Sequence, residues 1–177
     1  CLRSIEGVNE IVVCDTGSCD HTIDIAKKFT DKVFSGEEYL WRDDFAFSRN
    51  QSLKLCTGDW ILIIDADEEL EPGGIESIRE AIKATDKNAI RINAKAKGGK
   101  TVHKSIRVFK NNVGIEWKGA IHNYLNTTDA YDTDINLFYG YSPAHKLDPD
   151  RALRILSKVV KENPTCSREK YYLAREY

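Results

Sequence analysis

The sequence predicts an α/β fold: a mixed, mainly parallel sheet flanked by helices, with a helical hairpin at the C-terminus. Short apolar runs such as residues 61–64 have the length and composition of strands buried on both faces. In the first third of the chain such runs alternate with helix-like segments in the order β-α-β-α-β, which favours parallel strands joined by helical crossovers. Near the end, two segments with apolar residues at helical spacing are separated by Asn163-Pro164.

The first half is expected to supply the parallel strands. A helix-like segment at residues 1–5 is stopped by Gly7. Asp20 can cap the helix that follows the turn at residues 16–20. We expect helices at residues 22–29 and 44–56, and strands at residues 10–15, 32–34 and 60–64.

The second half is expected to be antiparallel. Pro72-Gly73-Gly74 breaks the chain before an amphipathic helix at residues 75–84, and Gly98-Gly99 suggests a hairpin or loop. Helices are expected at residues 149–162 and from residue 167 onward, packed as a hairpin. The remaining strands are expected at residues 89–94, 105–109, 115–117 and 135–141.

Composition limits the class of protein. A chain of 177 residues suits one domain, here residues 1–147, with residues 148–177 as the helical appendage. The net charge of −2 gives no global basic field for binding nucleic acid. No apolar stretch approaches the roughly 18 residues of a membrane span. Five cysteines match no zinc pattern and are expected to be reduced, as in a cytoplasmic protein. Since the chain has no Met, its beginning is not expected to be a natural translation start.

A dense acidic cluster follows the apolar run that begins at Trp60. Asp65 and Asp67 are two residues apart, so on an extended chain their side chains point the same way. Such a pair can hold a divalent cation against a phosphate-bearing ligand. An isolated Asp-x-Asp is also common in solvated turns. The buried strand before these acids favours the metal site, because it fixes where they lie.

Two further segments carry candidate ligand-binding residues. Asp15 ends the first predicted strand and opens a strand–helix turn, a natural nucleotide site in α/β folds. Its carboxylate could bond a base or a ribose, although the turn could equally be only a helix cap. Arg49, on the helix at residues 44–56, could pair with a diphosphate through its planar fork. A surface salt bridge is the alternative for Arg49.

Together these segments resemble glycosyltransferase family 2, the GT-A-fold proteins, in particular a bacterial branch with C-terminal tetratricopeptide-like helices. The branch shows Asp-Thr-Gly-Ser-x-Asp-x-Thr, Trp-x-x-Asp-Phe-Ala-x-x-Arg-Asn and Gly-Asp-Trp followed by Asp-x-Asp-Glu. Here these motifs are residues 15–22, 41–50 and 58–68. Residues 107–109, 119–122 and 138–141 resemble its Arg-x-Phe, Gly-x-Ile-His-Glu and His-x-Gly-Tyr segments.

The resemblance implies a metal-dependent enzyme that moves a sugar from a nucleotide-diphosphate donor, such as a UDP-sugar, with inversion. The implied acceptor is a glycan, a lipid-linked sugar or a protein, and the implied setting is the cytoplasm, with peripheral association at the inner membrane face. A homo-oligomer formed through an open sheet edge is a further expectation. The metal, Mn²⁺ or Mg²⁺, would be held by Asp65 and Asp67. The implied catalytic residues are His122 and Glu68, and the donor-binding residues are Asp15, Thr16, Asp44, Arg49 and Asp65.

Three departures from the family pattern keep other functions open. The family's N-terminal strand with Lys-Asn-Glu is absent, its Glu after His122 is Asn123, and the His of His-x-Gly-Tyr is Phe138. An amide cannot act as a general base at neutral pH. A nucleotidyltransferase is one alternative, although the chain shows no Gly-rich phosphate loop. A non-catalytic nucleotide-binding or interaction module is the other.

Overall fold

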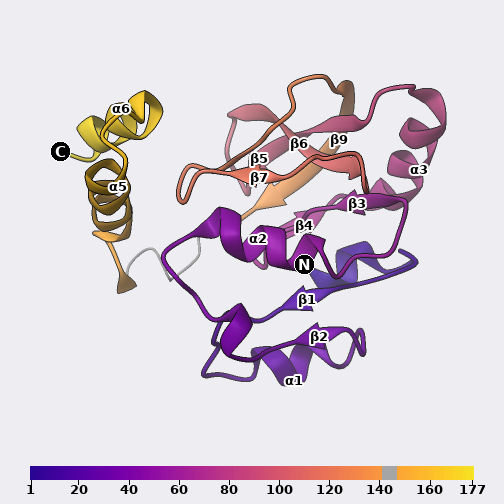
Figure 1. Cartoon of the computed structure of the whole chain (residues 1–177). Helices are drawn as coiled ribbons and strands as arrows, with labels where there is room; N and C mark the ends of the chain where they lie inside the picture. The colour runs from indigo at the N-terminus through magenta and orange to yellow at the C-terminus, as the bar shows by residue number, and fades with distance from the viewer. Residues whose placement is uncertain (141–146) are drawn as a thin grey trace.

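The computed structural model describes residues 1–140 and 147–177 (Figure 1). The helices are η1 (Leu2–Ile5), α1 (Thr22–Ala26), η2 (Glu37–Tyr39), α2 (Phe45–Leu53), α3 (Gly74–Ala84), α5 (Arg151–Glu162) and α6 (Ser167–Glu176). The strands are β1 (Val13–Cys14), β2 (Val33–Phe34), β3 (Trp60–Leu62), β4 (Glu68–Leu70), β5 (Ala89–Ala96), β6 (Val102–Lys110), β7 (Trp117–Lys118), β8 (Tyr124–Leu125) and β9 (Tyr131–Tyr139).

The sheet is mixed, as predicted, but it is not mainly parallel. Its five strands run in the order β3-β6-β5-β9-β4, and the pairs β1–β2 and β7–β8 lie outside it. Among the strands of the described residues, β1–β2 and β5–β9 are parallel, whereas β3–β6, β5–β6, β4–β9 and β7–β8 are antiparallel. The expectation of mostly parallel strands is wrong because β6 returns from β5 as a hairpin and takes the place beside β3.

Most predicted elements are present, with shifted ends. The predicted helices at residues 22–29 and 44–56 are shorter in the structure, since α1 ends at Ala26 and α2 at Leu53. The predicted strand at residues 135–141 begins earlier, at Tyr131, and its last predicted residue, Tyr141, lies outside the described residues. Strand β4 was not predicted as a strand. It lies within the acidic run and pairs with β9.

Each face of the sheet has its own apolar core. On one face, Ile75, Ile78 and Ala81 of α3 pack against β5 and β9 residues that include Ile90 and Leu137. The other face is covered by α2 and the β7–β8 pair. The core on this face consists of Ala46, Ile61, Ala89, Phe109, Trp117, Leu125 and Ala130. Because neighbouring side chains on a strand point to opposite faces, β3 contributes Ile61 to one core and Leu62 to the other.

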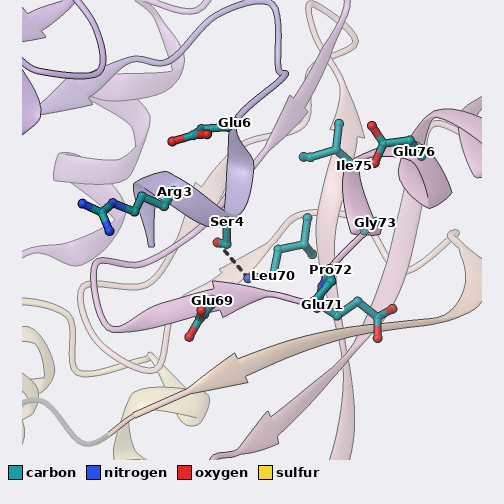
Figure 2. Close-up of a pocket in the computed structure, with 11 residues that line it drawn as sticks. Arg3, Ser4, Glu6, Glu69, Leu70, Glu71, Pro72, Gly73, Ile75 and Glu76 are labelled. Atoms are coloured by element: carbon teal, nitrogen blue, oxygen red, sulfur yellow. Dashed lines mark hydrogen bonds between the residues drawn. The ribbon is translucent and has the colours of Figure 1, made fainter.

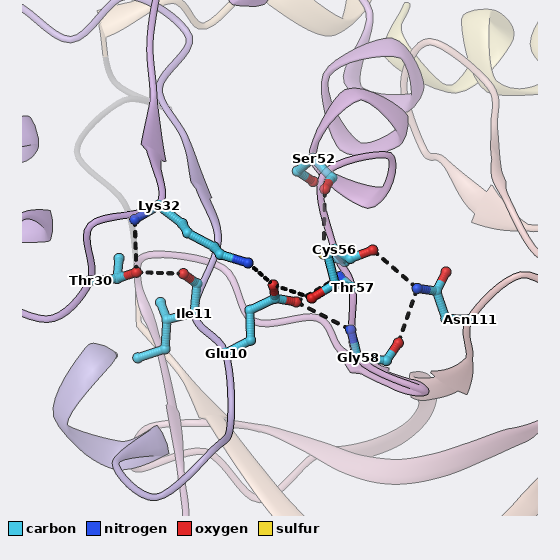
Figure 3. A network of polar contacts seen from close by, with 9 residues as sticks. All are labelled: Glu10, Ile11, Thr30, Lys32, Ser52, Cys56, Thr57, Gly58 and Asn111. Carbon is cyan, nitrogen blue, oxygen red and sulfur yellow. Dashed lines mark hydrogen bonds and ion pairs between the residues drawn. The ribbon is translucent and has the colours of Figure 1, made fainter.

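Glu10 ties the start of β1 to the segment that leads into β3 (Figure 3). Its carboxylate accepts hydrogen bonds from Thr57 N (2.8 Å), Thr57 Oγ1 (2.7 Å) and Gly58 N (3.3 Å), and also pairs with Lys32. The hydrogen bond from Lys32, together with those from Thr57 and Gly58, outweighs the effect of burial and lowers the pKa of Glu10 to about 2. Glu10 therefore joins the segments that lead into β1 and β3, and these strands are followed by Asp15 and Asp65, respectively.

The C-terminal helices α5 and α6 form the predicted hairpin and lie to one side of the sheet (Figure 1). Arg154 of α5 contacts Asp43 (3.2 Å) and Asp148 (2.8 Å), which attaches the hairpin to the segment before α2. Within residues 1–140 and 147–177, no helix is both long enough and apolar enough to cross a membrane.

Candidate functional site

Asp65 lies three residues beyond the end of β3 and faces two arginines. Arg49 Nη2 is 2.9 Å from Asp65 Oδ2 and 2.8 Å from Oδ1, and Arg107 Nη1 is 3.7 Å from Oδ2. Burial acts to raise the pKa of Asp65, but the hydrogen bonds and charges of Arg49 and Arg107 outweigh it, so the pKa lies below its usual value. Asp65 is therefore a fixed carboxylate at neutral pH.

Glu68 supports Asp65 from within the protein. It is only 4% exposed, and its two oxygens accept hydrogen bonds from Arg107 Nη1 (3.0 Å) and Nη2 (2.5 Å). Glu68 Oε2 also accepts a hydrogen bond from Asp65 N at 2.7 Å. Burial raises the pKa of Glu68, and the Arg107 charge opposes this rise. With both oxygens occupied in a buried ion pair, Glu68 holds the backbone of Asp65 in place.

Asp67 is placed differently, because its side chain is exposed. Its carbonyl oxygen accepts a hydrogen bond from Gly140 N at 3.0 Å, which fixes the backbone on which the carboxylate stands. Among the described residues, no group of three or more His, Cys, Asp or Glu forms a metal cage. Mg²⁺, however, is commonly bound by one or two carboxylates together with substrate phosphates. The carboxylate oxygens of Asp65 and Asp67 are of the chemical type that this mode requires.

The turn after β1 holds Asp15. One carboxylate oxygen, Oδ2, accepts hydrogen bonds from Gly17 N (3.0 Å) and Ser18 N (2.9 Å). Burial acts to raise the pKa of Asp15, but the hydrogen bonds from Ser18 and Gly17 lower it overall. The Thr16 carbonyl accepts a hydrogen bond from Trp41 N at 3.0 Å. In the part of the chain that the structure describes, no hydrogen bond or ion pair joins Asp15 to Asp65.

Helix α2 carries the third predicted segment. Asp44 is its N-cap and accepts a hydrogen bond from Phe47 N at 2.8 Å, so its observed role is to start the helix. Arg49 reaches Asp65 and stacks over the Trp117 ring at 4.8 Å. The next residue, Asn50, bonds both Trp117 N (2.8 Å) and Trp117 O (2.9 Å). The Arg-Asn pair of the motif thus connects the acids to β7.

His122 lies on the turn between β7 and β8, with a left-handed φ of 47°. Within the described residues it has no hydrogen bond or ion pair with the Asp65 cluster. Its contacts are instead with α6, where its ring stacks on Tyr172 at 4.3 Å. The neighbouring residue, Asn123, has a buried side-chain nitrogen for which the described residues offer no hydrogen-bond partner.

Arg107 is the site residue that the sequence analysis did not assign. It lies in β6 opposite the chain just after β3, where its carbonyl accepts a hydrogen bond from Ile63 N at 2.8 Å. Its position within the Arg-x-Phe segment was the available signal. The pairing of β6 with β3, which brings it beside Asp65 and Glu68, could not be read from the local sequence.

A pocket of about 350 Å³ lies between η1 and the turn that joins β4 to α3 (Figure 2). Ser4 Oγ accepts a hydrogen bond from Leu70 N (3.0 Å) at its wall. Its charged lining residues are Arg3, Glu6, Glu69, Glu71 and Glu76. None of the predicted site residues lines this pocket.

Comparisons with known proteins identify the family. The model of the family "Glycosyl transferase family 2" matches residues 1–141. A TPR repeat-containing protein of Synechococcus elongatus is 30% identical over 80% of this chain and 38% of its own length. The SPbeta prophage-derived glycosyltransferase SunS of Bacillus subtilis is 26% identical over 99% of this chain and 45% of its own length. The chain thus spans less than half the length of these relatives.

Solved structures show the same fold. The structure of S. aureus TarS 1-349 in complex with UDP superposes with a TM-score of 0.57 at 15% identity, covering 94% of this chain and 61% of that chain. A structure of S. aureus TarS gives a TM-score of 0.60, also at 15% identity, over 99% of this chain and 39% of that chain. The fold is therefore that of a GT-A glycosyltransferase, and with the family model matching most of its length, the chain belongs to glycosyl transferase family 2.

Proposed function

We propose that this protein transfers a sugar from a nucleoside-diphosphate donor to an acceptor hydroxyl, with the help of a divalent cation and with inversion at the anomeric carbon. The observation that carries the proposal is the fixed Asp65 carboxylate, held by Arg49, Arg107 and Glu68, next to the exposed carboxylate of Asp67. TarS structures hold UDP and UDP-GlcNAc, which favours a UDP-sugar as the donor.

Each group has a role that follows from its surroundings. Asp67, with Asp65, would hold Mn²⁺ or Mg²⁺; when bound, that ion offsets the charge of the diphosphate that leaves. Arg49 lies beside Asp65 and offers its guanidinium to the same phosphates. Asp15 and Thr16 would lie at the nucleoside end of the donor. Asp44 would act indirectly, by starting the helix that carries Arg49.

The acceptor side depends on His122. Transfer requires a base that takes the proton of the acceptor hydroxyl while the bond from the anomeric carbon to the diphosphate breaks. Asn123 cannot do this, and Glu68 is buried in its ion pair with Arg107. His122 is partly exposed and is therefore the proposed proton acceptor.

The proposal also covers the cellular location, the domain boundary and the acceptor. All five cysteines are free, which supports a reducing, cytoplasmic location. We place the boundary of the catalytic domain at residue 147, with residues 148–177 as the start of a helical region. Acceptor classes compatible with the family are glycans, lipid-linked sugars and proteins.

The donor site is tested by thermal unfolding of the full chain with UDP, ADP or GDP, each with Mn²⁺, Mg²⁺ or EDTA. A ligand that binds only the folded state stabilises it by about 2.7 kcal/mol at 100 times its Kd, enough to raise the melting temperature by several degrees. We expect the largest rise with UDP and Mn²⁺. The Asp67→Asn variant should lose the metal-dependent part of this rise.

Asp134→Asn is the matched control, because Asp134 is an exposed carboxylate on β9. It should keep the whole rise. A chain whose melting temperature responds to no nucleotide, with or without metal, would contradict the proposed function. Product analysis separates the alternatives. A sugar transferase releases UDP, and a nucleotidyltransferase releases pyrophosphate. A non-catalytic module, the alternative that is favoured by Asn123 in place of the family's Glu, binds UDP without releasing a product.

A further inference from the structure

Three side chains of α6 contact His122. Arg168 Nη2 donates a hydrogen bond to the His122 carbonyl oxygen at 2.6 Å. The Tyr172 ring stacks on the imidazole, with 4.3 Å between ring centroids and an angle of 23° between planes. Glu176 Oε1 lies 3.5 Å from His122 Nε2. These residues are four apart in sequence, so they share one face of α6.

The Arg168 side chain that bonds the His122 carbonyl is itself held by aromatic contacts. The Arg168 guanidinium lies between two rings, 4.3 Å from the centroid of Tyr124 and 4.7 Å from that of Tyr172. A planar guanidinium stacked in this way is fixed in orientation. The backbone of the His122 turn is therefore held in place by its contact with Arg168.

The turn that carries His122 is also anchored to α2. The Ala120 carbonyl accepts a hydrogen bond from Phe45 N, the first residue of α2, at 2.8 Å. Further along the same helix, Arg49 contacts Asp65. His122 is thus placed between the helix that reaches the donor acids and the helix that carries Glu176. Both His122 and Glu176 keep about a third of their side-chain surface exposed, so the pair is accessible from solvent.

We propose that Glu176 is a positioning residue for His122, so that the C-terminal hairpin completes the acceptor side of the site. At 3.5 Å the Glu176 carboxylate is close enough to Nε2 to favour the tautomer that carries the proton on Nε2, which leaves Nδ1 with a free electron pair. Nδ1 then takes the acceptor proton, the acceptor oxygen bonds the anomeric carbon, and the diphosphate leaves with the electrons of the broken bond. The His122–Glu176 pair thus supplies the general base that Asn123 cannot provide. This inference rests on the proposed function.

The kinetic test uses the full chain with UDP-GlcNAc and Mn²⁺, with water as the acceptor and UDP release as the signal. General bases contribute about 10²–10⁴ in rate, so we expect Glu176→Gln to lower kcat at least about tenfold with KM and UDP affinity unchanged. Glu176→Asp, which keeps the charge, should recover part of the rate. Glu162→Gln, which alters an exposed carboxylate at the end of α5, should not change kcat.

A double-mutant cycle shows whether the two residues act as one unit. His122→Gln should lose at least as much as Glu176→Gln, and the double variant should be no slower than His122→Gln alone. Additive losses, or a Glu176→Gln variant with the wild-type rate, would overturn the inference. A drop in UDP affinity in that variant would show that Glu176 supports the fold and has no separate effect on His122.

A spectroscopic readout keeps the inference testable without turnover. In two-bond ¹⁵N–¹H correlation spectra at a pH where the imidazole is neutral, His122 should carry its proton on Nε2. In Glu176→Gln that proton should exchange faster with solvent. A wild-type spectrum showing the Nδ1–H tautomer would refute the inference. A wild-type chain that has the Nε2–H tautomer but binds no UDP would instead refute the proposed donor function.

Discussion

At the scale of single residues, the site depends on one buried ion pair. Arg107 is 13% exposed and Glu68 is 4% exposed, and the pair fixes the backbone of Asp65. The position of Asp65 and Asp67 just after a strand was predictable, because an apolar run precedes them in the sequence. Arg107 was not, since it lies 39 residues from Glu68 and meets it only after β6 pairs with β3.

Arg107→Met tests the importance of this pair. Removing one partner of a buried ion pair leaves an uncompensated charge and costs about 3–5 kcal/mol of unfolding free energy. Urea denaturation measures this loss. Arg91→Met is the matched control, because its partner Asp132 is more than half exposed, and such pairs contribute about 1 kcal/mol or less. Equal losses in the two variants would contradict the buried role of Arg107.

At the scale of elements, periodicity located the α-helices and most strands, but it missed η2, β4 and β8. Strand β4 contains Glu68 and Glu69, residue types that are uncommon in strands, and it forms because β9 offers it a partner. Local sequence also gave no role for Asn50. The Asn50 side-chain amide makes the two backbone hydrogen bonds of Trp117 that a neighbouring strand would otherwise make, and it thereby joins α2 to β7.

Asn50→Ala should loosen α2 from β7. The change leaves both backbone groups of a buried Trp117 without partners, and each unpaired buried group costs about 1–3 kcal/mol. Hydrogen exchange should show the Trp117 amide exchanging faster than in the wild type. Gln51→Ala, on the same helix, should leave that amide protected. Unchanged protection of the amide in Asn50→Ala would show that β8 alone secures β7.

At the scale of the whole molecule, the fold class could be predicted and the strand order could not. Alternating strands and helices indicate an α/β domain, but nothing local states that β9 pairs with both β5 and β4. Long-range pairing of this kind is decided by which apolar faces can be buried together. The Glu10 contacts between β1 and the start of β3 are another long-range feature.

The Glu10 contacts predict a dependence of stability on pH. The folded pKa of Glu10 is about 2, below its value of 4.5 in a free chain, so its contribution is fully present above pH 4.5 and is lost as pH falls toward 2. We expect Glu10→Gln to lower the unfolding free energy by on the order of 1 kcal/mol at pH 6, since solvent screens the half-exposed Lys32.

Urea denaturation of both proteins between pH 2 and pH 7 measures this effect. The difference between wild type and Glu10→Gln should shrink as the solution is acidified. Glu38→Gln, which alters an exposed carboxylate in η2, should give a difference that stays small across the range. A Glu10→Gln difference that grows on acidification would contradict this assignment.

Helix α2 would give the proposed site a thermodynamic advantage. Its first residue bonds the turn that carries His122, and its fifth residue contacts Asp65. The orientation between the two halves of the site is therefore set when the chain folds. Two groups that are already oriented lose little translational and rotational entropy in each reaction cycle, and such orientation can lower a barrier by several kcal/mol, up to about 7–11 for well-aligned partners. The entropy cost of orienting these groups arises once, when the nine residues of α2 fold, and does not recur in each reaction cycle.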